Sequence, residues 1–265
     1  MINSIQEQTL FTTIRIESTD AAGKVVSIGT GFLLQRAVGQ DKYKIYLVSN
    51  KHVLNAGTGF ILNFITKENG TPVFSKLTRV EHSDIVGKVC GHPNPKVDVA
   101  AIELTGIFIS FSDRLYYKLV DLDMLATFDE PELNLTENVS FVGFPDGRYD
   151  QANNLPLIRT GVISSHPQFN YNGLPQFVID AQVFPGSSGS PVFIDLTYEN
   201  FKNGQIAIGG SRNYKLLGII AQTMIRNNQL QAIPTGTTFT TQEVLGLGIV
   251  FKATAIRELI ESMPS

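Results

Sequence analysis

Short apolar runs that alternate with polar positions dominate this chain of 265 residues. Because successive side chains of a strand point to opposite faces, each such run predicts a β-strand with one buried face. Gly, Pro, Asn and Asp separate the runs, as expected for turns. In the first half we predict strands at 9–16, 25–34, 43–48, 60–66, 73–80, 85–89 and 97–104. In the second half we predict strands at 139–144, 158–164, 176–183, 192–194, 205–208, 215–221 and 247–251.

One segment has a helical period instead. Over 253–263 the apolar residues recur at spacings of three and four, which predicts an amphipathic helix with Thr254 as its N-cap. Many short strands followed by one terminal helix indicate an all-β protein, a barrel or sandwich in two units. The acidic stretch at 116–136 is predicted to connect them. The expected division is a first β unit at 1–115, this linker, a second β unit at 137–252, and the helix at 253–265.

Composition narrows the classes of function. The net charge is −3 and the isoelectric point about 5.8, so no electrostatic argument favours binding to nucleic acid or to an acidic membrane. A single cysteine, Cys90, excludes an internal disulfide framework. No apolar run approaches the roughly 20 residues of a membrane span. Residues 1–7 do not resemble a signal peptide, so we expect a cytoplasmic protein, with neither a metal nor a cofactor.

The chemistry of the chain concentrates in a glycine-rich turn at 184–193. Glycine on both sides of Ser187 and Ser188 allows backbone angles that other residues resist. Such a turn presents a hydroxyl beside backbone N–H groups, which suits acyl transfer. Taken alone, the same turn is equally typical of an ordinary Gly-Ser hairpin loop. Among its serines, Ser188 is favoured over Ser187 and Ser190 as the nucleophile, since Gly189 follows it and Gly186 lies two positions before it.

A serine hydroxyl needs a base that takes its proton, and that base works best when a carboxylate orients it. Of the four histidines, His52 follows a predicted strand directly, whereas His82, His92 and His166 lie in polar loops. Asp98 begins an apolar run, where a carboxylate is costly without a partner. Taken alone, Asp98 is more typical of an acid that faces solvent. A thiol site at Cys90 and His92 is an alternative without a third partner.

Four segments in order give the chain a family resemblance. Gly29-Thr30-Gly31-Phe32, residues 47–53 ending in His52-Val53, residues 98–102 beginning with Asp98, and Gly186-Ser187-Ser188-Gly189-Ser190-Pro191 resemble the conserved motifs of trypsin-like serine peptidases. The nearest branch is the bacterial, HtrA-like one. The resemblance implies the chymotrypsin fold, which is two antiparallel β-barrels with the site in the cleft between them.

The resemblance also implies roles. Ser188 would attack a peptide carbonyl, His52 would take its proton, and Asp98 would hold the imidazole. The backbone N–H groups of Gly186 and Ser188 would form the oxyanion hole. The chain would therefore be a serine endopeptidase acting on proteins or peptides.

Departures from the family qualify this expectation. Digestive relatives carry Asp where this chain has Ser187, so activation by an inserted N-terminus is not expected. The specificity pocket would be formed by the uncharged residues Gln182, Ala221, Gln222 and Thr223, which favour a neutral or apolar residue before the scissile bond. A polar insertion at 195–214 is either a lid or exosite, or a tolerated surface loop.

Two other functions stay open. The chain could be a catalytically silent pseudoprotease that serves as a binding or sensing module, or an esterase that uses the same three residues on small acyl substrates. A cytoplasmic protease without a zymogen device must be restrained, so we expect a narrow substrate or a regulatory protein partner.

Overall fold

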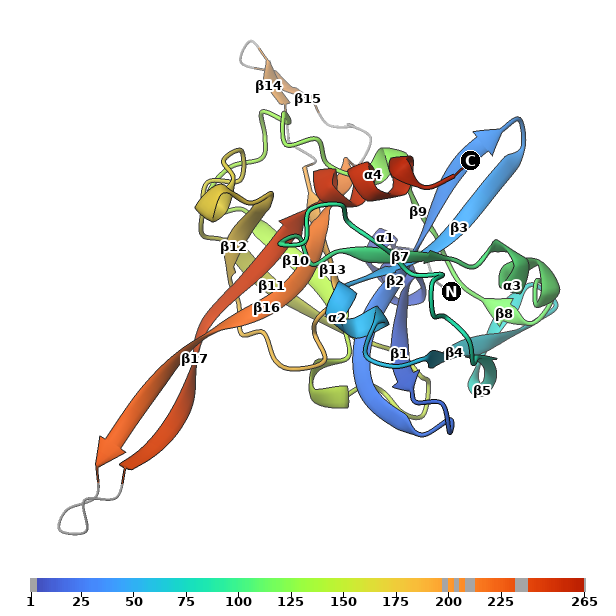
Figure 1. Cartoon of the computed structure of the whole chain (residues 1–265). Coiled ribbons are helices and arrows are strands. Elements are labelled where there is room, and N and C mark those ends of the chain that lie inside the picture. Colours follow the sequence, from blue (N-terminus) through green and yellow to red (C-terminus); the bar gives the residue numbers. More distant parts are fainter. Residues whose placement is uncertain (1–3, 197–199, 203–204, 208–212, 232–237, 265) are drawn as a thin grey trace.

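The computed structural model describes residues 4–196, 200–202, 205–207, 213–231 and 238–264 (Figure 1). It is nearly all-β, as predicted. The described helices are short, and none is long and apolar enough to cross a bilayer. They are α1 (Ile5–Thr12), α2 (Lys51–Leu54), α3 (Thr105–Ser110) and α4 (Ala253–Ser262), with single 3-10 turns at Leu122–Met124, Pro145–Gly147 and Tyr171–Gly173.

The first half of the chain forms one nine-stranded sheet. Its order is β5-β4-β1-β2-β3-β7-β6, while β8 pairs with β4, and β9 pairs in parallel with β2. The inner face buries a core of aliphatic and aromatic side chains around Ile16, Leu33 and Phe60. The strands are β1 (Thr13–Thr19), β2 (Val25–Gly39), β3 (Lys42–Ser49), β4 (Gly59–Glu68), β5 (Thr71–His82), β6 (Cys90–Gly91), β7 (Ala100–Glu103), β8 (Leu115–Tyr116) and β9 (Val120–Asp121).

The second half closes into a barrel in the order β10-β11-β12-β17-β16-β13. The strands are β10 (Asn138–Gly143), β11 (Leu157–Ile163), β12 (Gln176–Asp180), β13 (Pro191–Asp195), β16 (Tyr214–Gln231) and β17 (Thr238–Lys252). The expected fold class is confirmed, because a closed barrel, a second sheet and a C-terminal helix are arranged as in the chymotrypsin-like double barrel.

A single large core joins the two halves. It contains buried side chains of β2, β3 and β7 together with those of the barrel and of α4. Hydrogen bonds support the same junction, since Arg36 on β2 donates to the carbonyl oxygens of Ile260 (2.7 Å) and Met263 (3.0 Å) at the end of α4. The helix thus fixes the first sheet against the barrel.

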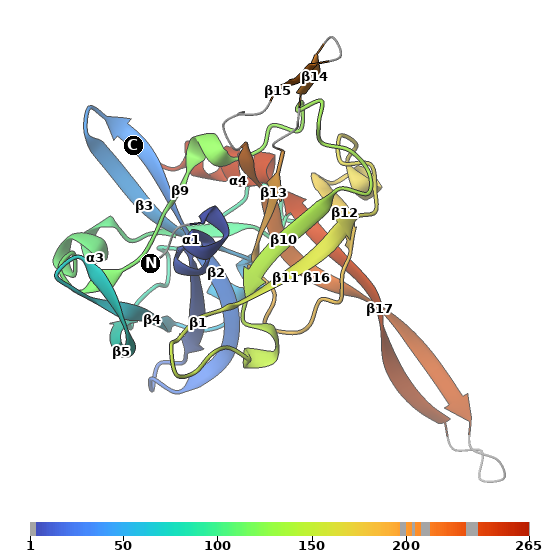
Figure 2. The same cartoon turned by 180° about the vertical axis from the view of Figure 1, so that it is seen from behind.

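Two hairpins leave this body. Strands β16 and β17 continue past the barrel as a long arm, which projects into solvent in both views (Figures 1 and 2). Strands β14 (Asn200–Lys202) and β15 (Gln205–Ala207) pair only with each other among the described strands. They belong to the polar insertion predicted at 195–214, whose residues 197–199, 203–204 and 208–212 lie outside the described part.

Some local predictions were wrong. Residues 9–12, predicted as strand, end helix α1, which begins because Ser4 and Glu7 form a capping box through two reciprocal hydrogen bonds. Residues 85–89 form a turn without a strand. The terminal helix begins at Ala253, so Lys252 rather than Thr254 is its N-cap, and no side chain caps it.

The predicted linker at 116–136 contributes to the first sheet at its beginning. Tyr116 pairs with Ile65, and Val120 pairs with Leu34. The rest leads to β10 with Leu125, Ala126 and Leu133 buried in the shared core. The boundaries predicted at 115 and 136 stay predictions.

We expect α4 to contribute strongly to stability. Ile256 is fully buried in the shared core, so Ile256→Ala should lower the free energy of unfolding by about 2–5 kcal/mol through lost burial and a residual cavity. Ile109 on α3 is 70% exposed, and Ile109→Ala should change it by less than about 0.5 kcal/mol. Urea unfolding of both variants checks this. Equal effects would contradict the assignment of α4 to the core.

Candidate active site

The serine turn is built from two consecutive tight turns. The first closes where the Ser187 N–H donates to the Phe184 carbonyl at 3.0 Å. Pro185 followed by Gly186 with φ of +84° is typical of a type II turn. The second closes where the Ser190 N–H donates to the Ser187 carbonyl at 3.0 Å. Ser188 is therefore the second residue of the second turn, which ends just before β13 begins at Pro191.

Close packing of main chain requires the glycines here. Gly189 has φ of +90°, and a Cβ at this position would lie 1.7 Å from the Thr30 carbonyl oxygen. A Cβ on Gly186 would lie 2.6 Å from the Phe144 carbonyl oxygen. A side chain at either position would have to displace the backbone. Close packing of the main chain therefore requires glycine at both positions.

Thr30, on β2 of the first half, holds the turn. Its hydroxyl donates to the Gly186 carbonyl (2.8 Å) and accepts from the Phe144 N–H (3.2 Å), and its N–H donates to the Ser188 carbonyl (3.0 Å). The Thr30 carbonyl accepts from the buried Ser49 hydroxyl at 2.6 Å. One fully buried threonine thus connects the serine turn with the strand end that precedes His52.

A second anchor orients the peptide group before Gly186. The Asp146 N–H donates to the Pro185 carbonyl at 2.6 Å. Because a trans peptide is planar with its C=O and N–H opposed, the Gly186 N–H points away from Asp146. Among the described residues, neither this N–H nor that of Ser188 has an acceptor. The turn therefore offers two backbone donors without an acceptor among the described residues.

His52 and Asp98 are brought together across 46 positions of sequence. The His52 Nδ1 atom lies 2.5 Å from the Asp98 Oδ2 atom, and the His52 N–H donates to Oδ1 at 3.2 Å. The imidazole is 52% exposed and the carboxylate 30%. This contact assigns the proton of a neutral ring to Nδ1 and leaves Nε2 as the acceptor.

The environment favours an ionised Asp98. Burial raises the pKa of this carboxyl, but the hydrogen bond and charge of the His52 ring, with the backbone N–H groups of His52 and Lys51, outweigh burial and leave the pKa below its ordinary value.

The residues before His52 hold the Asp98 loop. The Asn50 amide donates to the Asp98 carbonyl at 2.6 Å. The Lys51 ammonium donates to the carbonyls of His92 (2.8 Å) and Asn94 (3.0 Å). Helix α2 and the loop that carries Asp98 are thereby joined on both sides of the His52–Asp98 contact.

Ser188 makes no hydrogen bond to His52 in this structure. Its hydroxyl donates to the Ala221 carbonyl at 3.2 Å, and among the described residues no hydrogen bond joins it to the imidazole. The bonds from Thr30 to Ser188 and from Ser49 to Thr30 nevertheless place Ser188 beside the strand end that leads into α2. The three predicted residues share one region, with the His52–Asp98 hydrogen bond formed and no hydrogen bond between Ser188 and His52.

The residues predicted to form the specificity pocket have different surroundings. Ala221 is buried and follows the part of β16 that pairs with β13. Thr223 is half-buried, and its hydroxyl has no partner among the described residues. Gln182 and Gln222 are exposed. The structure does not test their role in specificity.

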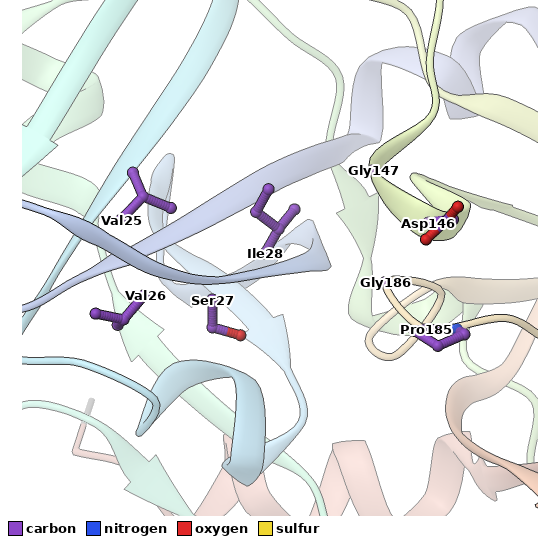
Figure 3. A pocket seen from close by; sticks show the side chains of 8 residues that line it. All are labelled: Val25, Val26, Ser27, Ile28, Asp146, Gly147, Pro185 and Gly186. Atoms are coloured by element: carbon purple, nitrogen blue, oxygen red, sulfur yellow. The ribbon is translucent and has the colours of Figure 1, made fainter.

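A cleft of about 410 Å³ lies between the serine turn and the beginning of β2 (Figure 3). Pro185 and Gly186, with Asp146 and Gly147, form one side, and the beginning of β2 forms the other. The β2 side carries exposed apolar side chains, including Val26 at 50%. The cleft is thus bordered by Gly186 of the serine turn.

A second cavity, of about 630 Å³, lies behind Pro185. Its wall includes Arg159, whose guanidinium lies over the rings of Phe141 (5.3 Å) and Phe184 (5.0 Å). Burial lowers the pKa of Arg159 from its ordinary value. This cation–π stack fixes Phe184 at the beginning of the serine turn.

The alternative thiol site finds no support in the geometry. His92 accepts from the Asn94 N–H at its Nδ1 atom, and its Nε2 lies 3.3 Å from a carboxylate oxygen of Glu258, so both nitrogens have partners other than Cys90. Within the described part of the chain, no three His, Cys, Asp or Glu side chains gather as a metal site would need.

The family of the chain follows from comparison. A family model described as a trypsin-like peptidase domain matches residues 29–198, more than half of the chain, and the chain belongs to this family. A search of curated proteins finds no match.

Solved structures agree on the fold. The active form of the Rv3671c protease from M. tuberculosis is 19% identical, with 99% of this chain and 85% of that chain covered at a TM-score of 0.51. HBP is 10% identical, with 97% of this chain and 95% of that chain covered, also at 0.51. At these identities the likeness concerns the fold alone. Membership of the trypsin-like family is confirmed, and the HtrA-like branch stays a prediction.

Sequence reasoning missed the anchors of the turn. Thr30 was part of a recognised motif, but its partner Gly186 lies 156 positions away. The Asp146 anchor acts through a backbone N–H and leaves no side-chain signal. Its one sequence trace is the Pro145-Asp146-Gly147 turn, where Asp146 has φ of +52°.

We expect the Thr30 hydroxyl to stabilise the fold. Thr30→Val keeps the shape but leaves the Gly186 carbonyl and the Phe144 N–H without a partner, at a cost of roughly 1–3 kcal/mol for each buried group. Thr30→Ser keeps the hydroxyl and is the matched control. Urea unfolding should find the valine variant clearly less stable than the serine variant. Equal stability would show that these bonds contribute nothing.

The lowered pKa of Asp98 predicts a pH-dependent contribution to stability. Because the pKa is lower in the folded than in the unfolded state, folding favours the carboxylate. This contribution is complete above the unfolded-state pKa of about 3.9 and disappears as the pH falls through the folded-state pKa.

Urea unfolding of wild type and Asp98→Asn across this range measures the effect. The wild type should be more stable at neutral pH, and the difference should shrink with acidification. A difference that is constant with pH would contradict the assignment, and Asp84→Asn is the control, since Asp84 has a 71% exposed side chain.

Proposed function

We propose that this protein is a serine endopeptidase whose nucleophile is Ser188. His52 is the general base, Asp98 orients and stabilises its imidazole, and the N–H groups of Gly186 and Ser188 form the oxyanion hole. The observation that carries the proposal is the 2.5 Å contact of His52 with Asp98, which leaves Nε2 as the acceptor. It is supported by the serine turn, whose two N–H donors have no acceptor among the described residues.

The reaction follows from these groups. The Ser188 oxygen attacks the peptide carbonyl while its proton passes to His52 Nε2, and the carbonyl oxygen becomes an oxyanion between the two N–H groups. Each such donor lowers the barrier by on the order of 3 kcal/mol. The imidazolium then protonates the leaving amine, and water hydrolyses the acyl-enzyme by the same steps.

The Ser188 hydroxyl must turn for this to occur. It is bonded to the Ala221 carbonyl, and a change of rotamer about the Cα–Cβ bond is the smallest motion that redirects it. Catalytic hydrogen bonds commonly tighten only when substrate binds. We propose that substrate bound along β16 competes for Ala221 and frees the hydroxyl.

The two sides of the turn suit an extended peptide. Residues before the scissile bond would lie against Ala221, Gln222 and Thr223, and Gln182 would complete a pocket for a neutral or apolar side chain. Residues after the bond would enter the cleft bordered by Gly186 and the apolar start of β2. The protein would act in the cytoplasm on a narrow set of substrates or under a regulatory partner.

The same Ser188 contact favours a second function. If the hydroxyl stays bound to Ala221, the protein is a catalytically silent member of the family that binds polypeptides without cleaving them. The two functions make opposite predictions for covalent labelling.

We expect a fluorophosphonate probe to label the wild type, since it reacts with activated serines through the proposed groups. Ser188→Ala should abolish labelling and His52→Ala should slow it by several orders of magnitude. Intact mass spectrometry measures the adduct.

Ser187→Ala is the matched control, because Ser187 is an adjacent, buried serine with no hydrogen-bond partner for its hydroxyl among the described residues. This variant should keep labelling. Absence of labelling in a folded wild type would favour the silent function. Labelling with turnover of esters but not of peptides would indicate an esterase.

A further inference from the structure

The edge of β16 becomes free next to Ser188. Strand β13 pairs with β16 from Tyr214 to Ile219, and the ladder ends with two bonds, Gly189 N–H to the Ile220 carbonyl and Ile220 N–H to the Ser190 carbonyl. From Ala221 onward, no described strand pairs with this edge. The Ser188 hydroxyl bonds to the first free carbonyl. The free edge therefore begins at the proposed nucleophile.

This edge is long and is held extended, since β16 continues to Gln231. Strand β17 supports β16 from its other side as far as the pair Gln231 with Thr238. Register shifts between Ile220 and Gln222 and between Thr223 and Ile225 mark bulges, which increase the twist of the arm. Both views show the arm projecting from the body (Figures 1 and 2). Beyond the serine turn at its base, no described strand pairs with this edge.

The arm has few of the residues that usually prevent another strand from pairing with a free edge. Free edges usually carry charged residues or proline, which discourage pairing. Between Arg226 and Glu243, which pair with each other at 2.6 Å, the sequence has no charged residue, and its only proline is in 232–237. Ile225, Val244 and Leu245 at the base are 42–46% exposed. A neutral, extended polypeptide fits such an edge through main-chain hydrogen bonds and apolar contacts.

We propose that the arm is an exosite that binds the substrate upstream of the scissile bond as an added β-strand along β16. This inference rests on the proposed function and specifies its substrate class, which is an unfolded or extended neutral segment. A strand antiparallel to β16 runs from Gln231 toward Ala221, so its C-terminal end arrives at Ser188. Because the main chain of the substrate would be recognised, the substrate segment must be long and extended, but it needs no particular sequence.

The test uses peptides of two lengths. A peptide with about four residues before the scissile bond can pair only with the base of β16, and one with about ten residues can also pair with the arm. Binding to Ser188→Ala is measured by fluorescence anisotropy, so the result does not depend on turnover. The long peptide should bind at least about tenfold more tightly, as one or two net hydrogen bonds would give.

Two hairpin variants locate the effect. In the armless variant, Asn-Gly replaces 226–243 and joins the cross-strand partners Ile225 and Val244. In the matched control, Asn-Gly replaces 232–237 and joins Gln231 and Thr238, so both strands stay. The control should keep the tenfold gain and the armless variant should lose it. A gain that persists without the arm overturns the proposal.

A further measurement does not depend on the folding of any variant. A long peptide with N-methylated backbone beyond the fourth residue cannot pair fully, and it should bind like the short one. Unchanged binding of the methylated peptide overturns the proposal. So does an arm-dependent dimer in light scattering with equal binding of both lengths, because a second copy would then cover the arm. Labelling and turnover decide the catalytic proposal separately.

Discussion

The site depends on one buried threonine that bonds across the two halves of the fold. Thr30 belongs to the first sheet, yet its hydroxyl and N–H hold two carbonyls of the serine turn, which belongs to the barrel. Its own carbonyl is held by Ser49, at the strand end that leads into the His52 helix. Because cores are closely packed and buried hydrogen bonds are costly to leave unmade, these contacts fix the turn relative to α2.

This arrangement explains how the turn is held without the usual device. Where digestive relatives carry an aspartate that pairs with a new N-terminus, this chain has Ser187, whose buried hydroxyl has no partner among the described residues. The orientation of the turn rests instead on Thr30, on the Asp146 N–H and on the stack of Arg159 against Phe184. All three contacts are made to carbonyl groups or to an aromatic ring. The N–H groups of Gly186 and Ser188 therefore stay available as donors.

The sequence was sufficient for the fold class, and the reason is physical, since alternation of apolar residues reports burial on one face of a strand directly. The contact of His52 with Asp98 was predicted only through the family resemblance, because an acid at the start of an apolar run can equally face solvent. Contacts through backbone groups, such as Asp146 with Pro185, leave no such trace. Local misreadings arose where tertiary or capping interactions decide, since residues 9–12 alternate like a strand but follow the Ser4–Glu7 capping box. The length of the arm was also missed, because its polar, uncharged residues carry little alternation of hydrophobicity.

We propose that two backbone N–H groups converge on an oxyanion beside an activated Ser188. A crystal structure of the phosphonate adduct would reveal this geometry. We expect phosphorus bonded to the Ser188 oxygen, with one phosphonyl oxygen about 2.7–3.1 Å from both the Gly186 and Ser188 nitrogens. An adduct on another residue, or a phosphonyl oxygen that faces solvent while the Gly186 N–H points elsewhere, would contradict it.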